Sequence, residues 1–332
     1  MILGKKHHYT KRWVYTIKMG FIKAYLKSMR PYTFFITGIA GLIGMLLVKS
    51  SVSLLQKIIV LVLLFFSYGV NQVINDLVGV REDKINSPKR PSISGELNKR
   101  KAIILTTFIF ISGAILTYFF NPYALIIYFL GYFANFLYEH LKRIPLLGNL
   151  WFGLMISLAT IYGALAITDL SLAQAINNLN LLCASLLIAL SSSAMCYFTY
   201  FKDYKGDKKE NINTLVVMLS GKPPFFLNSF MNLVSFLFLI TIFLLRLWTL
   251  EINTVFLTLV FIAFILTQYT SYLFSKNTIN YKKSLELNFE STVLFQTSIL
   301  ALINPLLSTI LFVLSFLIIK IIFNKMYKEE LY

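Results

Sequence analysis

Apolar runs of about 20 residues recur from one end of this chain to the other, and each is near the length that a helix needs to cross a bilayer. Backbone groups in lipid must be paired within helices or a closed barrel, and these runs lack the strict alternation of barrel strands. The sequence therefore predicts an all-α integral membrane protein that crosses the bilayer many times. The runs cover residues 33–50, 54–80, 101–120, 122–139, 148–168, 178–201, 224–246, 252–274, 287–303 and 306–323.

Proline and polar residues refine this pattern. Asn121-Pro122 and Asn304-Pro305 mark turns, because proline disfavours helical geometry in the residue before it. The run 287–303 carries Asn, Glu and Gln, which are rare on lipid-facing helices. We interpret it either as a span or as a partly buried or re-entrant segment.

Charge is scarce and unevenly placed. Hydrophobic residues make up 57% of the 332 residues and charged residues 14%, with a formal net charge of +17. Most Lys and Arg lie in short loops at 81–101, 140–143, 202–222 and 276–283, whereas 169–178 has none. This is the pattern that the positive-inside rule produces, so we expect no nucleic-acid partner. We expect the basic loops and the basic N-terminus on the cytoplasmic side.

Two acidic segments stand at the ends of apolar runs, where a carboxylate is costly. They read NQVINDLVGVREDKINSPKRP (Asn71–Pro91) and KDYKGDKKENINTL (Lys202–Leu215), in a chain with only 14 Asp and Glu. On one continuous helix, the acids and amides of the first segment would share an arc of about 140°, and Arg81 would point away. That face comprises Asn71, Gln72, Asn75, Asp76, Gly79, Glu82 and Asp83.

The second segment carries its own acidic pair, Asp203 and Asp207, at the i, i+4 spacing. Two carboxylate faces at one end of a bundle offer the oxygen ligands that Mg²⁺ accepts when it also binds a substrate phosphate. Both segments are expected on the cytoplasmic side, so the two faces would hold a diphosphate between them. The candidate phosphate contacts are Arg90, Lys142, Arg143 and Lys202, each of which has the alternative interpretation of a topology marker.

At these residues the chain resembles the UbiA superfamily of intramembrane prenyltransferases. The family's first motif, NDxxDxxxD with a loop ending in Arg-Pro, is matched by NDLVGVRED (Asn75–Asp83) and KINSPKRP. The resemblance runs from about residue 30 to 303. It departs from the motif at Gly79, where the family usually has an aspartate, and Glu82 is the residue that would compensate. The second motif is matched by Lys202, Asp203, Gly206, Asp207, Thr214 and Leu215.

The resemblance implies a domain of nine core transmembrane helices at 33–303. Before it, at 1–32, we expect a basic segment with an amphipathic interfacial helix (Trp13–Met29), because lysines alternate there with apolar residues. After it, at 304–332, we expect a tenth transmembrane helix and a basic tail.

The implied activity is Mg²⁺-dependent transfer of a polyprenyl group from a polyprenyl diphosphate to a small acceptor. We predict an aromatic quinone precursor such as a hydroxybenzoate, with a haem, a chlorophyll precursor or a glycerol phosphate lipid as the other acceptors in the family. Two further hypotheses are a non-catalytic isoprenoid-binding member and a cation-coupled transporter. The metal ligands are predicted to be Asp76, Asp83, Asp203 and Asp207 with Glu82, and the substrate-binding residues Asn71, Asn75, Arg90, Lys142, Arg143 and Lys202.

Overall fold

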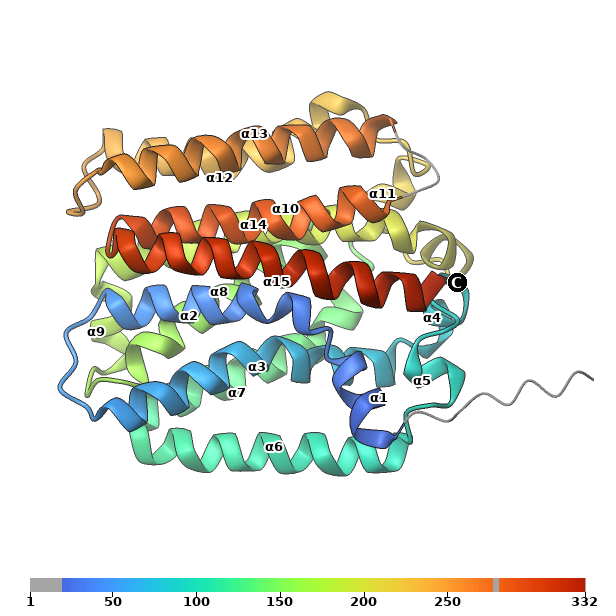
Figure 1. The fold of residues 1–332 in the computed structure, drawn as a ribbon, viewed down its shortest axis with the longest axis horizontal. Helices are drawn as coiled ribbons and strands as arrows, with labels where there is room; N and C mark the ends of the chain where they lie inside the picture. The colour runs from blue at the N-terminus through green and yellow to red at the C-terminus, as the bar shows by residue number, and fades with distance from the viewer. Residues whose placement is uncertain (1–19, 277–280, 332) are drawn as a thin grey trace, which may run out of the picture.

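A computed structural model describes residues 20–276 and 281–331, with side chains described as far as Met326. In these residues the chain forms helices and no strand, and the long helices run side by side as one bundle (Figure 1). The long helices are α2 (Phe34–Leu46), α3 (Leu54–Val78), α6 (Lys99–Phe120), α7 (Pro122–Leu141), α8 (Leu147–Leu165), α10 (Leu179–Lys209), α12 (Phe225–Leu244), α13 (Thr254–Lys276), α14 (Lys282–Ala301) and α15 (Pro305–Leu331). The short helices are α1 (Phe21–Ser28), η1 (Pro31–Thr33), α4 (Val80–Asn86), α5 (Pro91–Ser94), α9 (Leu172–Asn177) and α11 (Leu215–Met218).

The predicted all-α membrane fold is confirmed, and in the described residues nine long helices, α2 to α14, are followed by α15 as a tenth. Within the described ranges, nine helical segments are long and apolar enough to cross a membrane, the first of them combining α1 and α2. The long helix outside that set is α14. Helix α14 is continuous over 20 residues, so the segment is not re-entrant.

Helix α14 is polar because it is enclosed by protein. Every residue from Asn288 to Ala301 is buried, and the helix packs against α2, α10, α13 and α15. Some of its polar side chains hydrogen-bond within the bundle, and Asn288 Nδ2 donates to the carbonyl of Met195 at 3.0 Å, whereas the buried Gln296 amide has no partner among the described residues. Because no side of α14 faces lipid, the helix does not need an apolar face.

The two predicted Asn-Pro turns are present. Asn121 caps α7, and its side chain accepts a hydrogen bond from the backbone N–H of Tyr123 at 2.8 Å. Asn304 accepts in the same way from the N–H of Leu307 at 3.0 Å before α15. In both turns a proline opens the following helix, where its missing N–H costs nothing.

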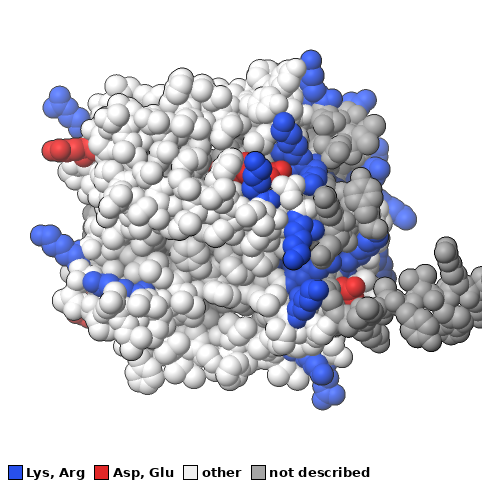
Figure 2. All heavy atoms as spheres, in the orientation of Figure 1, with Lys and Arg blue, Asp and Glu red and all other residues white. Residues whose placement is uncertain are grey.

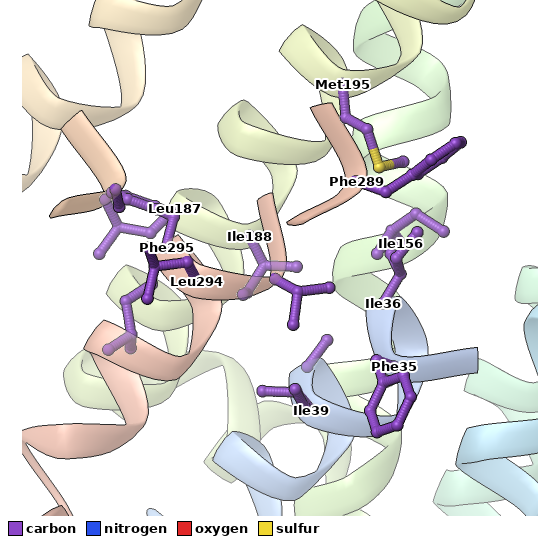
Figure 3. Packing of buried hydrophobic residues seen from close by; sticks show 14 of the residues in the cluster. Phe35, Ile36, Ile39, Ile156, Leu187, Ile188, Met195, Phe289, Leu294 and Phe295 are labelled. Carbon is purple, nitrogen blue, oxygen red and sulfur yellow. The ribbon is translucent and has the colours of Figure 1, made fainter. Parts of the chain in front are cut away.

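The core lies between α2, α8, α10 and α14 (Figure 3). Ile36, Ile156, Ile188 and Phe295, one from each helix, are at most 2% exposed. Contact between α2 and α8 is close because glycine removes a side chain. A Cβ at Gly44 would lie 1.8 Å from a backbone carbonyl of α8. These helices form a rigid frame behind the polar end of the bundle.

Lys and Arg side chains gather mainly at one end of the molecule, the end that carries α4 and α5 (Figures 1 and 2). Both acidic segments end there as well. Of the predicted interfacial stretch Trp13–Met29, residues 13–19 lie outside the described part. The remainder forms α1, which packs on α3 and α5 with Ile22 and Leu26 exposed.

Candidate active site

The first acidic segment is divided between two helices. Helix α3 ends at Val78, Gly79 adopts ψ 35°, and α4 begins at Val80. The prediction of one continuous helical face was therefore wrong, because glycine at a helix end relaxes the helical geometry. Asp76 still points into the same cavity as the acids of α4, and Arg81 is exposed, as expected.

A polar cavity of about 880 Å³, measured to its open mouth, lies at this end of the bundle. Helices α3, α4, α7 and α10 supply most of its charged walls. The two acidic segments face one another across it, as the sequence predicts. Its carboxylates are Asp76, Glu82, Asp83, Glu139, Asp203 and Asp207, and its cations are Arg30, Arg90, Lys142 and Lys202.

Two arginines bind the acids of the first segment. Arg30 Nη2 donates to Asp76 Oδ1 at 2.6 Å, and Arg90 Nη1 lies 3.4 Å from the same oxygen. Arg90 also donates to Asp83. Asp76 is 1% exposed, and its Oδ2 has no hydrogen-bond partner among the described residues. A buried carboxylate oxygen without a partner is costly, so this atom is suited to a cation that enters with the substrate.

A second ion-pair group links α4 to the end of α7. Lys142 Nζ lies 2.7 Å from Glu82 Oε1 and 2.6 Å from Glu139 Oε2. Burial alone would raise the pKa of Glu82, but the hydrogen bond and charge of Lys142 outweigh it, so that pKa is lowered. Burial would lower the pKa of Lys142, but the charges and hydrogen bonds of Glu139 and Glu82 outweigh burial, so that pKa is raised. Glu82 therefore stays ionised.

Asp83 shows that the two acidic segments meet. Burial raises the pKa of Asp83 to about 6, Arg90 opposes this rise, and the charges of Asp76 and Asp203 add to it. Asp203 belongs to α10, more than 100 positions away. An acid of one segment that faces an acid of the other across a cavity indicates a place for a polyvalent cation.

A hydrogen bond fixes α4 against α10. The backbone N–H of Gly206 donates to Asn86 Oδ1 at 2.8 Å. A Cβ at Gly206 would lie 2.5 Å from the Asn86 side chain, so only glycine allows this approach. The contact holds Glu82 and Asp83 opposite Asp203 and Asp207.

An apolar cavity of about 670 Å³ continues from the polar one between α3, α7 and α8. The two cavities share Tyr68, Gln72 and Phe152. Leucine, isoleucine and tyrosine residues form half of its lining. The site thus has two parts and is bipolar: a charged chamber lies at the end of the bundle, and an apolar chamber extends from it into the bundle interior.

The donor set fits Mg²⁺, although its acids are held apart by cations. Among the described residues, no three acidic, His or Cys side chains are already close enough together to hold a metal ion. Arg30, Arg90 and Lys142 instead lie between the carboxylates as counter-charges. Carboxylate oxygens on a phosphate-sized cavity are the ligands Mg²⁺ uses, and an entering diphosphate would draw these cations to its own oxygens.

Most predicted site residues line the polar cavity: Asn75, Asp76, Glu82, Asp83, Arg90, Lys142, Lys202, Asp203 and Asp207. Two lie elsewhere. Asn71 borders the apolar cavity, and Arg143 borders a separate cleft beside α7. The sequence interpretation placed Gln72 on the acid and amide face without giving it a role, and it missed Arg30 and Glu139. Arg30 stands before a proline at the end of an amphipathic basic stretch, which is the signal that could have identified it.

The arrangement is that of an intramembrane enzyme acting on a diphosphate with an apolar tail. The chain belongs to the UbiA prenyltransferase family, whose model matches residues 34–289. It is therefore a prenyltransferase, and the resemblance seen in the sequence is confirmed. The hypotheses of a transporter and of a non-catalytic binding protein are not supported.

Relatives with known names indicate the branch of the family. The digeranylgeranylglyceryl phosphate synthase of Pyrococcus horikoshii is 30% identical over 202 residues, which cover 60% of this chain and 70% of that protein. The enzyme of the same name from Pyrococcus furiosus is 29% identical over 203 residues, with the same coverage. These names correct the prediction of an aromatic quinone precursor, because the product they state is a glyceryl phosphate lipid.

Solved structures share the fold. A structure from a study of digeranylgeranylglyceryl phosphate synthase in membranes is 25% identical, with a TM-score of 0.57, and covers 86% of this chain and 98% of that one. A UbiA homologue from Aeropyrum pernix has a TM-score of 0.64 at 17% identity, covering 81% and 97%. A homologue from Archaeoglobus fulgidus, solved with DMAPP and Mg²⁺, has a TM-score of 0.60 at 15% identity, covering 85% and 99%.

Proposed function

We propose that this chain transfers a geranylgeranyl group from geranylgeranyl diphosphate to geranylgeranylglyceryl phosphate, with Mg²⁺ as the metal. The observation that supports this most is the bipolar site, in which a chamber lined by six carboxylates and four cations joins an apolar chamber. The acceptor class follows from the relatives, whose named product carries two geranylgeranyl groups on glyceryl phosphate.

The charged residues have separable tasks in this reaction. Asp76, Asp83, Asp203 and Asp207, with Glu82, would hold Mg²⁺, which supplies positive charge to the diphosphate leaving group. Arg30, Arg90, Lys142 and Lys202 would bind the diphosphate oxygens directly. Because the arginines and Lys142 already contact the acids, they need to move only from carboxylate to phosphate oxygens.

Bond changes then balance within the two substrates. The acceptor hydroxyl oxygen forms a bond to the allylic carbon as the bond from that carbon to the diphosphate oxygen breaks. The electron pair leaves with the diphosphate, and the hydroxyl proton passes to a diphosphate oxygen.

The junction of the two chambers is where the allylic carbon would lie. Tyr68 and Phe152 line both chambers there, with ring centroids 6.2 Å apart, and their faces can stabilise positive charge on that carbon. Apolar walls beyond them exclude water, which would otherwise capture the carbocation.

The test is a prenyl-transfer assay on the purified full-length chain with radiolabelled geranylgeranyl diphosphate, geranylgeranylglyceryl phosphate and a hydroxybenzoate. We expect labelled glyceryl lipid only, and its loss when EDTA removes Mg²⁺. Asp76→Ala and Asp207→Ala should each lower kcat at least about a hundredfold, because charge stabilisation of the leaving group is lost.

Asp169→Asn is the matched control, because Asp169 is exposed in the loop between α8 and α9. It should keep full activity. A labelled aromatic product, or turnover that persists in EDTA, would contradict the proposed substrates and metal respectively.

A further inference from the structure

A second cleft lies beside the polar cavity, between the α3–α4 junction and α7. It has a volume of about 840 Å³ measured to its open mouth. The two spaces share Asn75, Gly79, Glu82 and Glu139 as a common wall. The cleft therefore borders the place where the diphosphate would bind without being part of it.

The rim of this cleft is cationic. Arg81, His140 and Arg143 line it, all three are exposed, and none forms an ion pair with a described residue. The cleft's own acids are already engaged, since Glu82 and Glu139 both bind Lys142. Arginine guanidinium groups can donate two parallel hydrogen bonds to the oxygens of a phosphomonoester. The rim is therefore suited to a second phosphate group, separate from the diphosphate in the polar cavity.

A buried amide faces the inside of the cleft. Asn135 is 1% exposed, and neither its Oδ1 nor its Nδ2 has a hydrogen-bond partner among the described residues. It borders both this cleft and the apolar cavity. Leaving a buried amide without partners is energetically costly, so its position indicates a polar ligand atom such as a glycerol oxygen.

The cleft continues into an apolar groove on the outside of the bundle. This groove, about 810 Å³ in volume, lies between α3, α6 and α7, and it shares Ile74 and Val78 with the cleft. Leu77, Ile103 and Phe110 line it further along. A hydrocarbon chain could lie there, in contact with lipid, while a phosphate occupies the cationic rim.

Gly79 stands where the cleft meets the polar cavity. Without a side chain it leaves that wall thin: a Cβ there would lie 3.5 Å from Glu82 Oε1. A polar group held in the cleft could therefore approach the diphosphate site at this point, while Asn135 leads from the cleft toward the apolar cavity. Gly79, which stands where the family usually has an aspartate, thus keeps the wall between the cleft and the polar cavity thin.

We propose that this cleft binds the acceptor, a glyceryl lipid with a phosphomonoester headgroup, with its phosphate on Arg81, His140 and Arg143 and its hydrocarbon chain in the α3–α6–α7 groove. This assignment depends on the proposed function for the identity of the acceptor. Asn135 would bind a glycerol oxygen of the acceptor, between its phosphate and its hydrocarbon chain.

The test compares Arg81→Gln and Arg143→Gln with the wild-type chain in lipid nanodiscs. Each variant should raise the KM for geranylgeranylglyceryl phosphate about tenfold or more and leave the KM for geranylgeranyl diphosphate within about twofold, because only one substrate loses a charge-assisted contact. Arg100→Gln is the matched control, since Arg100 is exposed at the same end and borders neither cavity. It should change neither constant.

Two further acceptors separate phosphate recognition from lipid recognition. Geranylgeranylglycerol, which lacks the phosphate, should have the same KM with the wild-type chain and with Arg143→Gln. Glycerol phosphate without the hydrocarbon chain should remain sensitive to Arg143→Gln but bind weakly. Equal effects of Arg143→Gln on the phosphorylated and unphosphorylated lipids would overturn the assignment.

Failure of this inference is distinguishable from failure of the proposed function. If the wild-type chain prenylates the glyceryl phosphate lipid and the two variants leave its KM unchanged, only the cleft assignment is wrong. If the wild-type chain prenylates a different acceptor, the proposed function is wrong. Retained binding of geranylgeranyl diphosphate shows in either case that the variants are folded.

Discussion

A glycine and a glutamate, Gly79 and Glu82, lie next to each other at the centre of the site. Position 79 has no side chain, and the space that one would enter is bordered by the carboxylate of Glu82 at 3.5 Å. Glu82 is held there by Lys142 and remains ionised because that cation lowers its pKa. Moving a carboxylate three positions along the chain places it near the same point, since a helical turn returns to the same side.

Glu82→Gln should therefore weaken metal-dependent substrate binding. We expect the Mg²⁺ concentration for half-maximal binding of geranylgeranyl diphosphate to rise about tenfold, because one anionic ligand becomes neutral. Titration of Mg²⁺ against binding of the labelled diphosphate measures this. Adding Gly79→Asp to the same chain should restore much of the affinity.

Glu251→Gln is the control, because Glu251 is exposed in the loop between α12 and α13. An unchanged Mg²⁺ titration in Glu82→Gln would show that Glu82 serves only as the partner of Lys142.

Residue types and spacing were enough to predict most of the charged wall. The i, i+4 pair Asp203 and Asp207 lies on α10 as expected, because the helix continues to Lys209. Arg30 was not predicted, since its contact with Asp76 joins positions 46 apart and depends on how η1 turns the chain. Arg143 was assigned to the diphosphate, but the end of α7 directs it to the neighbouring cleft. Spacing along one helix does not fix contacts between helices.

At the scale of elements, the active site depends on how α4 is held against α10. Four residues of α4 or its flank contact the cavity, and the hydrogen bond from Gly206 to Asn86 joins the two helices. The break between α3 and α4 was not predicted, because a single glycine inside a helical pattern is often tolerated. The long helices were predicted because a lipid environment demands them, whereas the short ones depend on local packing.

Gly206→Ala should disturb this junction. The added Cβ would lie 2.5 Å from the Asn86 side chain, so Asn86 must move and give up its hydrogen bond. We expect a loss of about 1–2 kcal/mol in stability and a lower kcat, because α4 carries two of the proposed metal ligands. Thermal unfolding and steady-state kinetics measure the two effects.

Gly131→Ala, on α7, is the matched control, since a Cβ at that position has nothing within 4 Å. Because Gly131 also borders the apolar chamber, it is a control for stability alone, and it should leave the free energy of unfolding unchanged or slightly raised. Equal stability of the two variants would mean that the added Cβ at Gly206 does not disturb the α4–α10 contact.

At the scale of the whole molecule, the proposed function predicts that the apolar chamber selects the prenyl group. Its walls come from α2, α3, α7 and α8, and Gly131 borders it with free space in front of its Cα. Gly131→Phe should fill part of the chamber and shift the preference from geranylgeranyl to geranyl diphosphate. Competition between the two labelled diphosphates measures the shift, with Gly131→Ala as the size control. An unchanged preference would place the prenyl chain elsewhere.

The enclosure of α14 has a consequence for how the chain is made. A segment with Asn288, Glu290 and Gln296 on it gains little from entering lipid alone, and every residue from Asn288 to Ala301 is buried by its neighbours. Helices α13 and α15 flank it in sequence and both pack on it. Stable membrane insertion of α14 therefore requires that these three helices assemble together, so the ribosome must complete α15 before the second half of the bundle can close.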